Sequence, residues 1–165
     1  MMEIRKPKKS DIEGLKRLSA NFADEYEWGD KIPIGQIDTA KKAEERLFGD
    51  DIEEVLVAVD KERLIGYIAV NGYEYEGEKG YEASILIDKD YRGQGLGRIM
   101  TDKIFSKMPV EIEAEAWVAD FNQASLKATP KMGFELEDKF LEDEFIPGRK
   151  YHVYVFTRSG EKSSK

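Results

Sequence analysis

Residues 81–108 constrain the fold more than any other stretch, because they combine a strand, a glycine-rich turn and a helix. The apolar run YEASILI is followed by DKDY, then by RGQGLG, and then by the amphipathic segment RIMTDKIFSKM. Glycine weakens helices. Three glycines at alternate positions where a helix begins therefore need another reason, which is either close packing of the turn or the approach of a ligand.

A bound phosphate would explain these glycines. The N-terminus of a helix presents unpaired N–H groups and a partial positive charge. Without side chains at Gly93, Gly95 and Gly97, a phosphate can approach those donors directly, and Arg92 and Arg98 add positive charge. The spacing is not G-x-G-x-x-G, and no Gly-Lys-Ser/Thr follows, which excludes a P-loop. The turn is therefore predicted to bind a phosphate, with packing alone as the alternative.

The rest of the chain alternates between strand and helix patterns. Ser10 and Glu13 form a predicted capping box, and Pro109 is expected to end the helix after the glycine turn. On that helix Ile99, Ile104 and Phe105 are predicted to share one apolar side with Met108. Strands are predicted over 2–6, 54–60, 64–76, 81–90, 110–118, from 134 and over 149–157, and helices over 10–22, 39–48, 95–108 and from 122. This order indicates a mixed α/β or α+β fold.

Composition narrows the class of protein. A chain of 165 residues, 41% hydrophobic, suits a single domain over 1–158, with 159–165 as a disordered tail. It has no cysteine, so it has no disulfide, thiolate zinc site or cysteine nucleophile. No apolar run approaches a membrane span, and a net charge of -8 argues against nucleic acid. We therefore expect a soluble cytoplasmic protein, ion-rich as heat-adapted proteins often are, whose charge favours a cationic partner such as an amine.

Two segments resemble the GNAT N-acetyltransferase family. RGQGLG, residues 92–97, follows an apolar strand and resembles the family's acyl-CoA signature, R-x-x-G-x-G/A, through Arg92, Gly95 and Gly97. The segment NQASLKATPKMGF, residues 122–134, resembles the second family segment. The order of the predicted elements also matches, so the resemblance covers roughly residues 2–158.

The resemblance implies an α/β (α+β) fold with a mixed central sheet of about six to seven strands, flanked by about four helices. The sheet would splay open after the fourth strand, YEASILI, and acetyl-CoA would lie in the split. The pantetheine arm would pair with the strand edge, the pyrophosphate would sit on the glycine turn, and an asparagine would bind from the far side. The implied contacts are Ile85, Leu86, Ile87, Arg92, Gly93, Gln94, Gly95, Leu96, Gly97, Arg98 and Asn122. Asn122 is equally suited to a helix cap, and the two roles are compatible.

Transfer to an amine requires a base, and the chain offers several carboxylates for that role. Glu82 begins the cofactor strand, and Glu115 lies on the strand across the split with Glu111 and Glu113. Glu82 and Glu115 are the predicted catalytic residues, and a solvated acidic face is the alternative. The acidic and aromatic segment ADEYEWGD, residues 23–30, is either a lip over the acceptor site or a plain surface loop.

The acid that protonates the leaving thiolate is left open. The family commonly uses a tyrosine seven residues after the asparagine, and here that position is Thr129. Solvent or Tyr154 would be substitutes, although core packing is the other interpretation of Tyr154. The sole histidine, His152, receives no role.

These features predict acetyl transfer from acetyl-CoA to a primary amine, either a small cationic amine or a peptidyl one, by direct attack. The first alternative is a catalytically weak acyl-CoA sensor, which Thr129 favours. The second is a phosphate-binding domain that uses nucleotides. A homodimer stays open.

Overall fold

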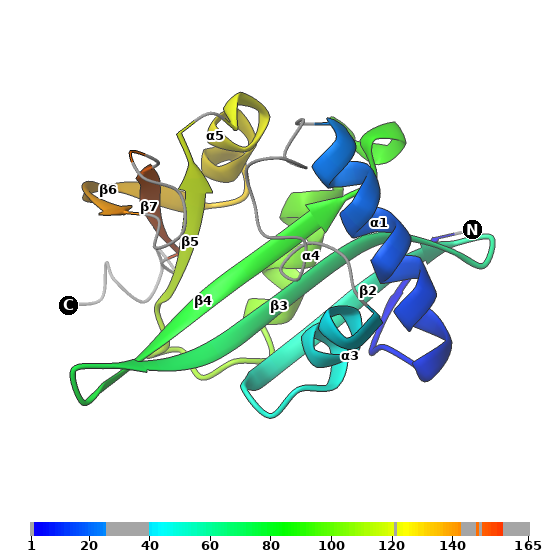
Figure 1. The fold of residues 1–165 in the computed structure, drawn as a ribbon, viewed down its shortest axis with the longest axis horizontal. Coiled ribbons are helices and arrows are strands. Elements are labelled where there is room, and N and C mark those ends of the chain that lie inside the picture. Colours follow the sequence, from blue (N-terminus) through cyan, green and yellow to red (C-terminus); the bar gives the residue numbers. More distant parts are fainter. Residues whose placement is uncertain (1, 26–39, 121, 143–147, 149, 157–165) are drawn as a thin grey trace.

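The computed structural model describes residues 2–25, 40–120, 122–142, 148 and 150–156. Within these residues seven strands form one sheet in the order β1-β2-β3-β4-β5-β7-β6 (Figure 1). The strands are β1 (Met2–Arg5), β2 (Ile52–Asp60), β3 (Arg63–Tyr75), β4 (Glu78–Ile87), β5 (Ala114–Ala119), β6 (Phe134–Glu142) and β7 (Lys150–Phe156). The helices are α1 (Ile12–Glu25), α3 (Ala40–Phe48), α4 (Leu96–Phe105) and α5 (Gln123–Lys131).

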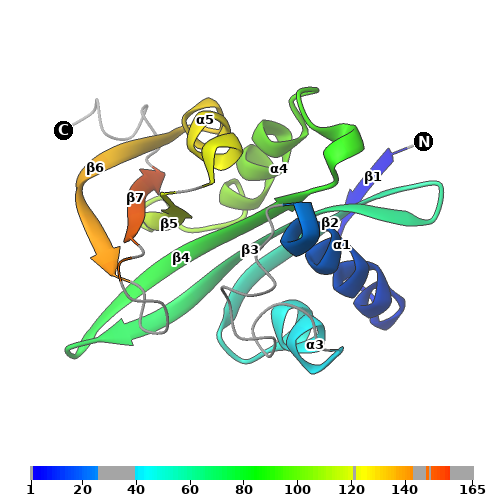
Figure 2. The ribbon, with the colours of Figure 1, turned by 45° about the horizontal axis from the view of Figure 1, so that its top comes forward.

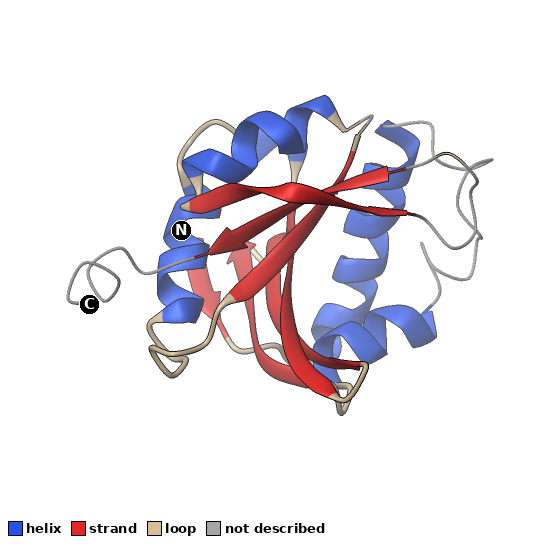
Figure 3. Cartoon of the chain, turned by 90° about the vertical axis from the view of Figure 1, so that its left-hand side faces the viewer, coloured by secondary structure: helices blue, strands red, loops and turns tan. Residues whose placement is uncertain are grey.

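Helices cover both faces of the sheet. Figure 2 shows α4 and α5 on one side and α1 and α3 on the other, and Figure 3 shows the strands between these layers. Each face has its own apolar cluster. Met100, Ile104 and Phe105 of α4 belong to the cluster on the first face, and Leu15 and Leu47 to the cluster on the second. The central strands β2 and β3 are therefore buried on both sides, whereas β6 exposes Leu136 and Phe140.

The sheet splits between its fourth and fifth strands. β4 pairs antiparallel with β3 along its whole length, from Glu78 to Ile87. On its other side β4 pairs with β5 in parallel at only one position, Glu82 opposite Glu115, and the two strands then diverge. Beyond the split, β5, β7 and β6 pair antiparallel. The predicted mixed sheet that splays after the fourth strand is confirmed.

Three local predictions need correction. Ser10 lies inside a short 3-10 turn, Lys9–Asp11, and the carboxylate of Asp11 accepts the backbone N–H of Lys8, so Asp11 replaces the predicted capping box. The predicted strand over 110–118 begins only at Ala114, so Glu111 and Glu113 precede the strand.

The third correction concerns α4, which ends at Phe105 and is therefore not ended by Pro109, and whose buried face also differs from the prediction. Ile99 is 49% exposed, whereas Leu96, Met100 and Ile104 are buried. Spacing by four residues places these three on the core side, and Ile99 lies off that stripe.

The acidic segment falls largely outside the described residues. α1 continues through Glu25, so the predicted loop begins later than residue 23. Residues 26–30 of that segment, and the predicted tail 159–165, lie outside the part of the chain that the structure describes.

Candidate active site

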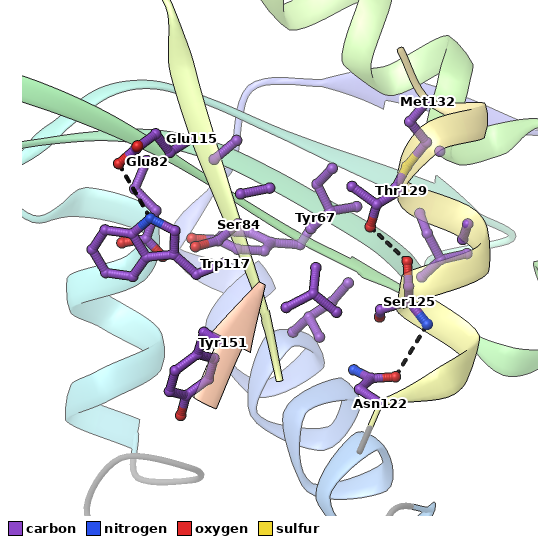
Figure 4. A pocket seen from close by; sticks show the side chains of 18 of the residues that line it. Tyr67, Glu82, Ser84, Glu115, Trp117, Asn122, Ser125, Thr129, Met132 and Tyr151 are labelled. Carbon is purple, nitrogen blue, oxygen red and sulfur yellow. Dashed lines mark hydrogen bonds between the residues drawn. The ribbon is translucent and has the colours of Figure 1, made fainter. Parts of the chain in front are cut away.

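A cleft of about 1490 Å³ opens where β4 and β5 diverge (Figure 4). We call one side the glycine wall, formed by Gly93, Gly95, Leu96, Gly97 and Asn122. We call the other side the carboxylate wall, formed by Tyr67, Tyr73, Glu82, Glu115 and Trp117.

The glycine turn has a backbone that only glycine adopts easily. Gly93 and Gly95 have φ angles of 76° and 83°, in the left-handed region. A Cβ atom at either position would meet nothing within 4 Å, so crowding does not explain these glycines. Gly95 is the N-cap of α4, and no side chain caps that helix end. The first N–H groups of α4 are therefore available to a ligand in the open space in front of them.

Gly97 has a different role. A Cβ atom there would lie 2.6 Å from the Sδ atom of Met132, just beyond α5. The absence of a side chain lets α4 and Met132 approach closely. The packing alternative therefore explains Gly97, whereas it does not explain Gly93 or Gly95.

Polar side chains near the turn are engaged with the protein. Arg92 Nε donates to the carbonyl of Ile87 at 3.0 Å, which ties the turn to the end of β4. Arg98 Nε donates to both carboxylate oxygens of Asp102 at 3.1 Å. Gln94 Nε2 donates to the carbonyl of Asp90 at 3.3 Å. These contacts order the turn and leave the exposed Arg98 at the rim of the cleft.

The backbone N–H groups near the end of β4 do not all point into the split. The N–H of Asp88 donates to the carbonyl of Ile65 at 2.8 Å, so it points toward the β3 side. Because peptide groups alternate along a strand, Leu86 also directs its N–H toward β3, whereas Ile85 and Ile87 direct theirs into the split. Of the three residues predicted to pair with a ligand, Ile85 and Ile87 have the suitable orientation. The side chain of Leu86 packs with the cluster under α1 and α3.

Asn122 caps α5 from inside the cleft wall. Its side chain is buried, 4% exposed, and Oδ1 accepts the N–H of Ser125 at 3.1 Å. The predicted helix cap is confirmed. Within the described residues the side-chain amide nitrogen makes no hydrogen bond that would occupy it, so a donor group lines the cleft. The cap and a ligand contact use different atoms of Asn122.

Neither hydroxyl considered for the thiolate's proton is well placed. Thr129 is buried, and its Oγ1 donates to the carbonyl of Ser125 at 2.7 Å (Figure 4). Tyr154 is buried in the core, and burial raises its pKa. The core-packing interpretation of Tyr154 is therefore confirmed.

Glu115 is held as an anion. Its Oε1 accepts from Tyr73 Oη at 2.8 Å and from Trp117 Nε1 at 3.3 Å, and its Oε2 pairs with Lys139 Nζ at 2.7 Å. Burial alone would raise the pKa of Glu115, but these three donors outweigh burial and lower the pKa. Burial, and then the bond to Glu115, raise the pKa of Tyr73 to about 12, so Tyr73 remains a donor.

Glu82 is directly paired with Glu115, but it is not held as an anion. It is partly buried, and among the described residues no donor hydrogen-bonds its carboxylate. Burial, and then the charge of Glu115, raise the pKa of Glu82 to about 7, against the opposing effect of Arg46. Two neighbouring carboxylates with pKa values driven apart are typical of acid–base sites.

The structure adds residues that the sequence did not reveal. Tyr67 and Tyr73 from β3, Arg46 from α3 and Lys139 from β6 join the predicted carboxylates in one cleft. Trp117 had a weak signal, because it follows Glu115 by two residues on an alternating strand. The others come from separate elements and left no local pattern. No group of side chains in the described chain is suited to a metal ion.

Comparison with known proteins agrees with this geometry. The model of the Acetyltransferase (GNAT) family matches residues 17–134. A structure from Streptococcus mutans UA159 is similar, with a TM-score of 0.75, 19% identity and coverage of 94% of this chain and 98% of that one. The PaiA N-acetyltransferase of Thermoplasma acidophilum, in complex with coenzyme A, has a TM-score of 0.68, 19% identity and coverage of 96% and 99%.

A third similar structure is the ribosomal-protein-alanine N-acetyltransferase of Brucella melitensis, with a TM-score of 0.72, 20% identity and coverage of 94% and 99%. A search of curated proteins finds no match. None of the described helices combines the length and apolarity that crossing a bilayer demands. The family match covers well over half of the chain, and it includes the glycine turn and the split of the sheet. The chain therefore belongs to the GNAT family of acetyltransferases, whose acyl donor, acetyl-CoA, is the co-substrate expected from the sequence.

Proposed function

We propose that this protein transfers the acetyl group of acetyl-CoA to a primary amine by direct attack of the amine on the thioester. One observation carries the proposal. A single cleft holds an uncapped helix N-terminus on one wall and, on the other, a carboxylate whose pKa of about 7 suits a general base.

The glycine wall fits the donor. The open space in front of Gly93 and Gly95 would accept the pyrophosphate on the N–H groups of α4. The inward N–H and carbonyl of Ile85 and the inward N–H of Ile87, whose carbonyl accepts from Arg92, would pair with the pantetheine arm as an added strand. The side-chain amide of Asn122 supplies a donor from the opposite side. These contacts use main chain and one amide, as binding of a long flexible ligand requires.

On the carboxylate wall, Glu82 would accept the proton of the incoming ammonium group. The neutral nitrogen then attacks the thioester carbon, the carbon–sulfur bond breaks, the thiolate leaves, and the second proton that the new amide nitrogen must lose passes to solvent. An N–H of the open β4 edge, at Ile85 or Ile87, would stabilise the developing oxyanion. Because Thr129 and Tyr154 are engaged elsewhere, solvent would protonate the thiolate. Glu115 is held too firmly by its three donors to act as the base, so we propose that it supports Glu82.

The acceptor is proposed only as a class. Aromatic rings and carboxylates line the carboxylate wall, which suits a cationic amine. A small amine and a peptide amine both meet this description.

A thiol-release assay over a panel of polyamines, aminoglycosides, amino acids and basic peptides tests the proposal. We expect turnover with at least one class, rising with pH through about 7 as Glu82 loses its proton. Glu82→Gln should lower kcat/KM by about 10²–10⁴-fold and abolish that acidic limb, while coenzyme A affinity stays unchanged. An unchanged pH profile would refute the base.

Two other outcomes identify the alternatives. Coenzyme A binding without turnover on any amine would support the acyl-CoA sensor. Protection against thermal unfolding by ATP or NAD, with none from coenzyme A, would support a nucleotide-binding domain and overturn the proposal.

A further inference from the structure

An irregularity in β6 directs a lysine onto the carboxylate wall. Leu136 pairs with Tyr154 and Phe140 pairs with His152, so three residues of β6, 137–139, stand opposite the single residue Val153. Regular pairing after Leu136 would place Lys139 opposite Tyr151 instead. The bulge thus moves Lys139 by two positions, or about 7 Å along the strand, toward the level of Glu115. Bulges beside active sites often redirect a side chain in this way.

The ion pair that results crosses a whole strand. β6 and β5 are not neighbours, because β7 lies between them. Lys139 nevertheless reaches over β7 and places Nζ 2.7 Å from Glu115 Oε2. The Glu115 side chain is 18% exposed and that of Lys139 is 49% exposed, so water screens the pair from the lysine side and less from the carboxylate side.

The location of this ion pair points to a role in the reaction. Glu115 stands opposite Glu82 at the one position where β4 and β5 pair. The charged or titratable groups around Glu82 are Glu115 from β5, Arg46 from α3, and Tyr67 and Tyr73 from β3. Of these, Glu115 is the only anion, and its partner is Lys139.

We propose that Lys139 is a positioning residue that the β6 bulge places on Glu115, and that this ion pair sets the pH above which Glu82 can take a proton from the acceptor amine. The inference rests on the proposed function for its biological meaning. The expected effect of the ion pair on the ionisation of Glu82 involves residues of this chain alone, so it can be tested without any acceptor.

The first variants remove the two members of the pair separately. Lys139→Met leaves the Glu115 anion uncompensated beside Glu82, which should raise the midpoint of Glu82 ionisation by roughly one pH unit. Glu115→Gln removes that anion and should lower the midpoint by a similar amount. Loss of a purely structural ion pair would not shift the midpoint in opposite directions.

The midpoint is measured by ¹³C NMR titration of Glu-labelled protein, with Glu82→Gln used to assign the signal. The acidic limb of kcat/KM with the best amine should shift in the same sense as the midpoint. The NMR readout remains valid if no amine turns over, so failure of the proposed function is distinguishable from failure of this inference.

Two control variants test whether the shift depends on a positive charge at position 139. Lys139→Arg keeps the cation and should keep the midpoint. Lys6→Met removes the same charge from a cation that lies near Glu54, outside the cleft, and should not move the midpoint. If Lys139→Met lowers the Glu82 midpoint or leaves it in place, or if Lys6→Met shifts it equally, the proposal is wrong.

Discussion

The two walls of the cleft are built in different ways. The glycine wall depends on main chain: left-handed glycines, an uncapped helix and the free edge of β4. The carboxylate wall depends on side chains that come from β3, β4, β5 and β6. A ligand held by main chain requires the absence of side chains, and that requirement is visible as glycines in one short stretch. A side-chain network requires only that distant residues meet, and no local pattern records it.

This difference has a functional consequence. Under the proposed function, the glycine wall binds the acetyl-CoA donor through main-chain groups, and the carboxylate wall binds the acceptor. The carboxylate wall can change residue by residue without disturbing the donor site. Variants in one wall should therefore leave the property of the other wall intact.

Gly95→Val should produce the largest effect on the glycine wall. The φ angle of 83° is strained for a β-branched residue, and the new side chain would enter the space in front of the α4 amides. We expect coenzyme A affinity to fall by about 100-fold, or about 2.7 kcal/mol, measured by calorimetry.

Gly77→Val is the matched control, because Gly77 has a φ angle of 82°, equally open surroundings and a place in the β3–β4 turn outside the cleft lining. Gly77→Val should lower the free energy of unfolding about as much as Gly95→Val does, but it should not weaken coenzyme A binding. If Gly95→Val also leaves the affinity intact, the glycine wall is not the pyrophosphate site.

The carboxylate wall is tested by measuring how the free energy of unfolding depends on pH. Folding raises the pKa of Glu82 to about 7, so ionisation of Glu82 removes stability as pH rises from about 4.5 to 7. Glu82→Gln should therefore stabilise the protein by about 1–2 kcal/mol at pH 8 and by nothing at pH 4.

Glu115→Gln should have the opposite sign. The lowered pKa of Glu115 contributes stability at neutral pH that is lost as pH falls. Urea unfolding at pH 4 and pH 8 measures the free energy of unfolding of both variants. If both variants change it in the same direction at pH 8, the opposite pKa shifts assigned to Glu82 and Glu115 are contradicted.

Asn122 allows the two roles of one residue to be separated. Asn122→Ala removes the cap and the side-chain amide and should cost about 1 kcal/mol of stability. Asn122→Ser retains a capping oxygen but loses the amide, so stability should be nearly kept. Both variants should weaken coenzyme A binding by about fivefold, the loss of one hydrogen bond. If Asn122→Ser binds like the wild type, Asn122 is a cap only.

Gly97→Ala should have the smallest effect. Its Cβ would press on Met132, whose flexible side chain can shift, so we expect less than about 1 kcal/mol of destabilisation. Combination with Met132→Ala should cost less than the sum of the two single variants, measured by thermal unfolding. Additive costs would show that Gly97 and Met132 are not coupled.

Much of the architecture could be predicted because local patterns and burial agree. The strand, turn and helix at 81–108 were located, and so was the order of elements around them. The errors arose where a tertiary contact decides. Asp11, bound to Arg5 at 2.8 Å, replaced Ser10 at the first helix, and a turn in which the N–H of Ile112 donates to the carbonyl of Pro109 at 3.1 Å delays the strand predicted from residue 110 until Ala114.

The sequence by itself determined the glycine turn and the order of elements, because backbone conformation and periodic burial are local properties of the chain, and its resemblance to the GNAT family implied the split sheet. Only the tertiary structure decided which carboxylate is free to titrate. Glu82 and Glu115 look alike in the sequence, and they differ because Tyr73, Trp117 and Lys139 converge on one of them. That convergence depends on the pairing of strands and on a bulge in β6, and a charge responds to every group that folding brings near it.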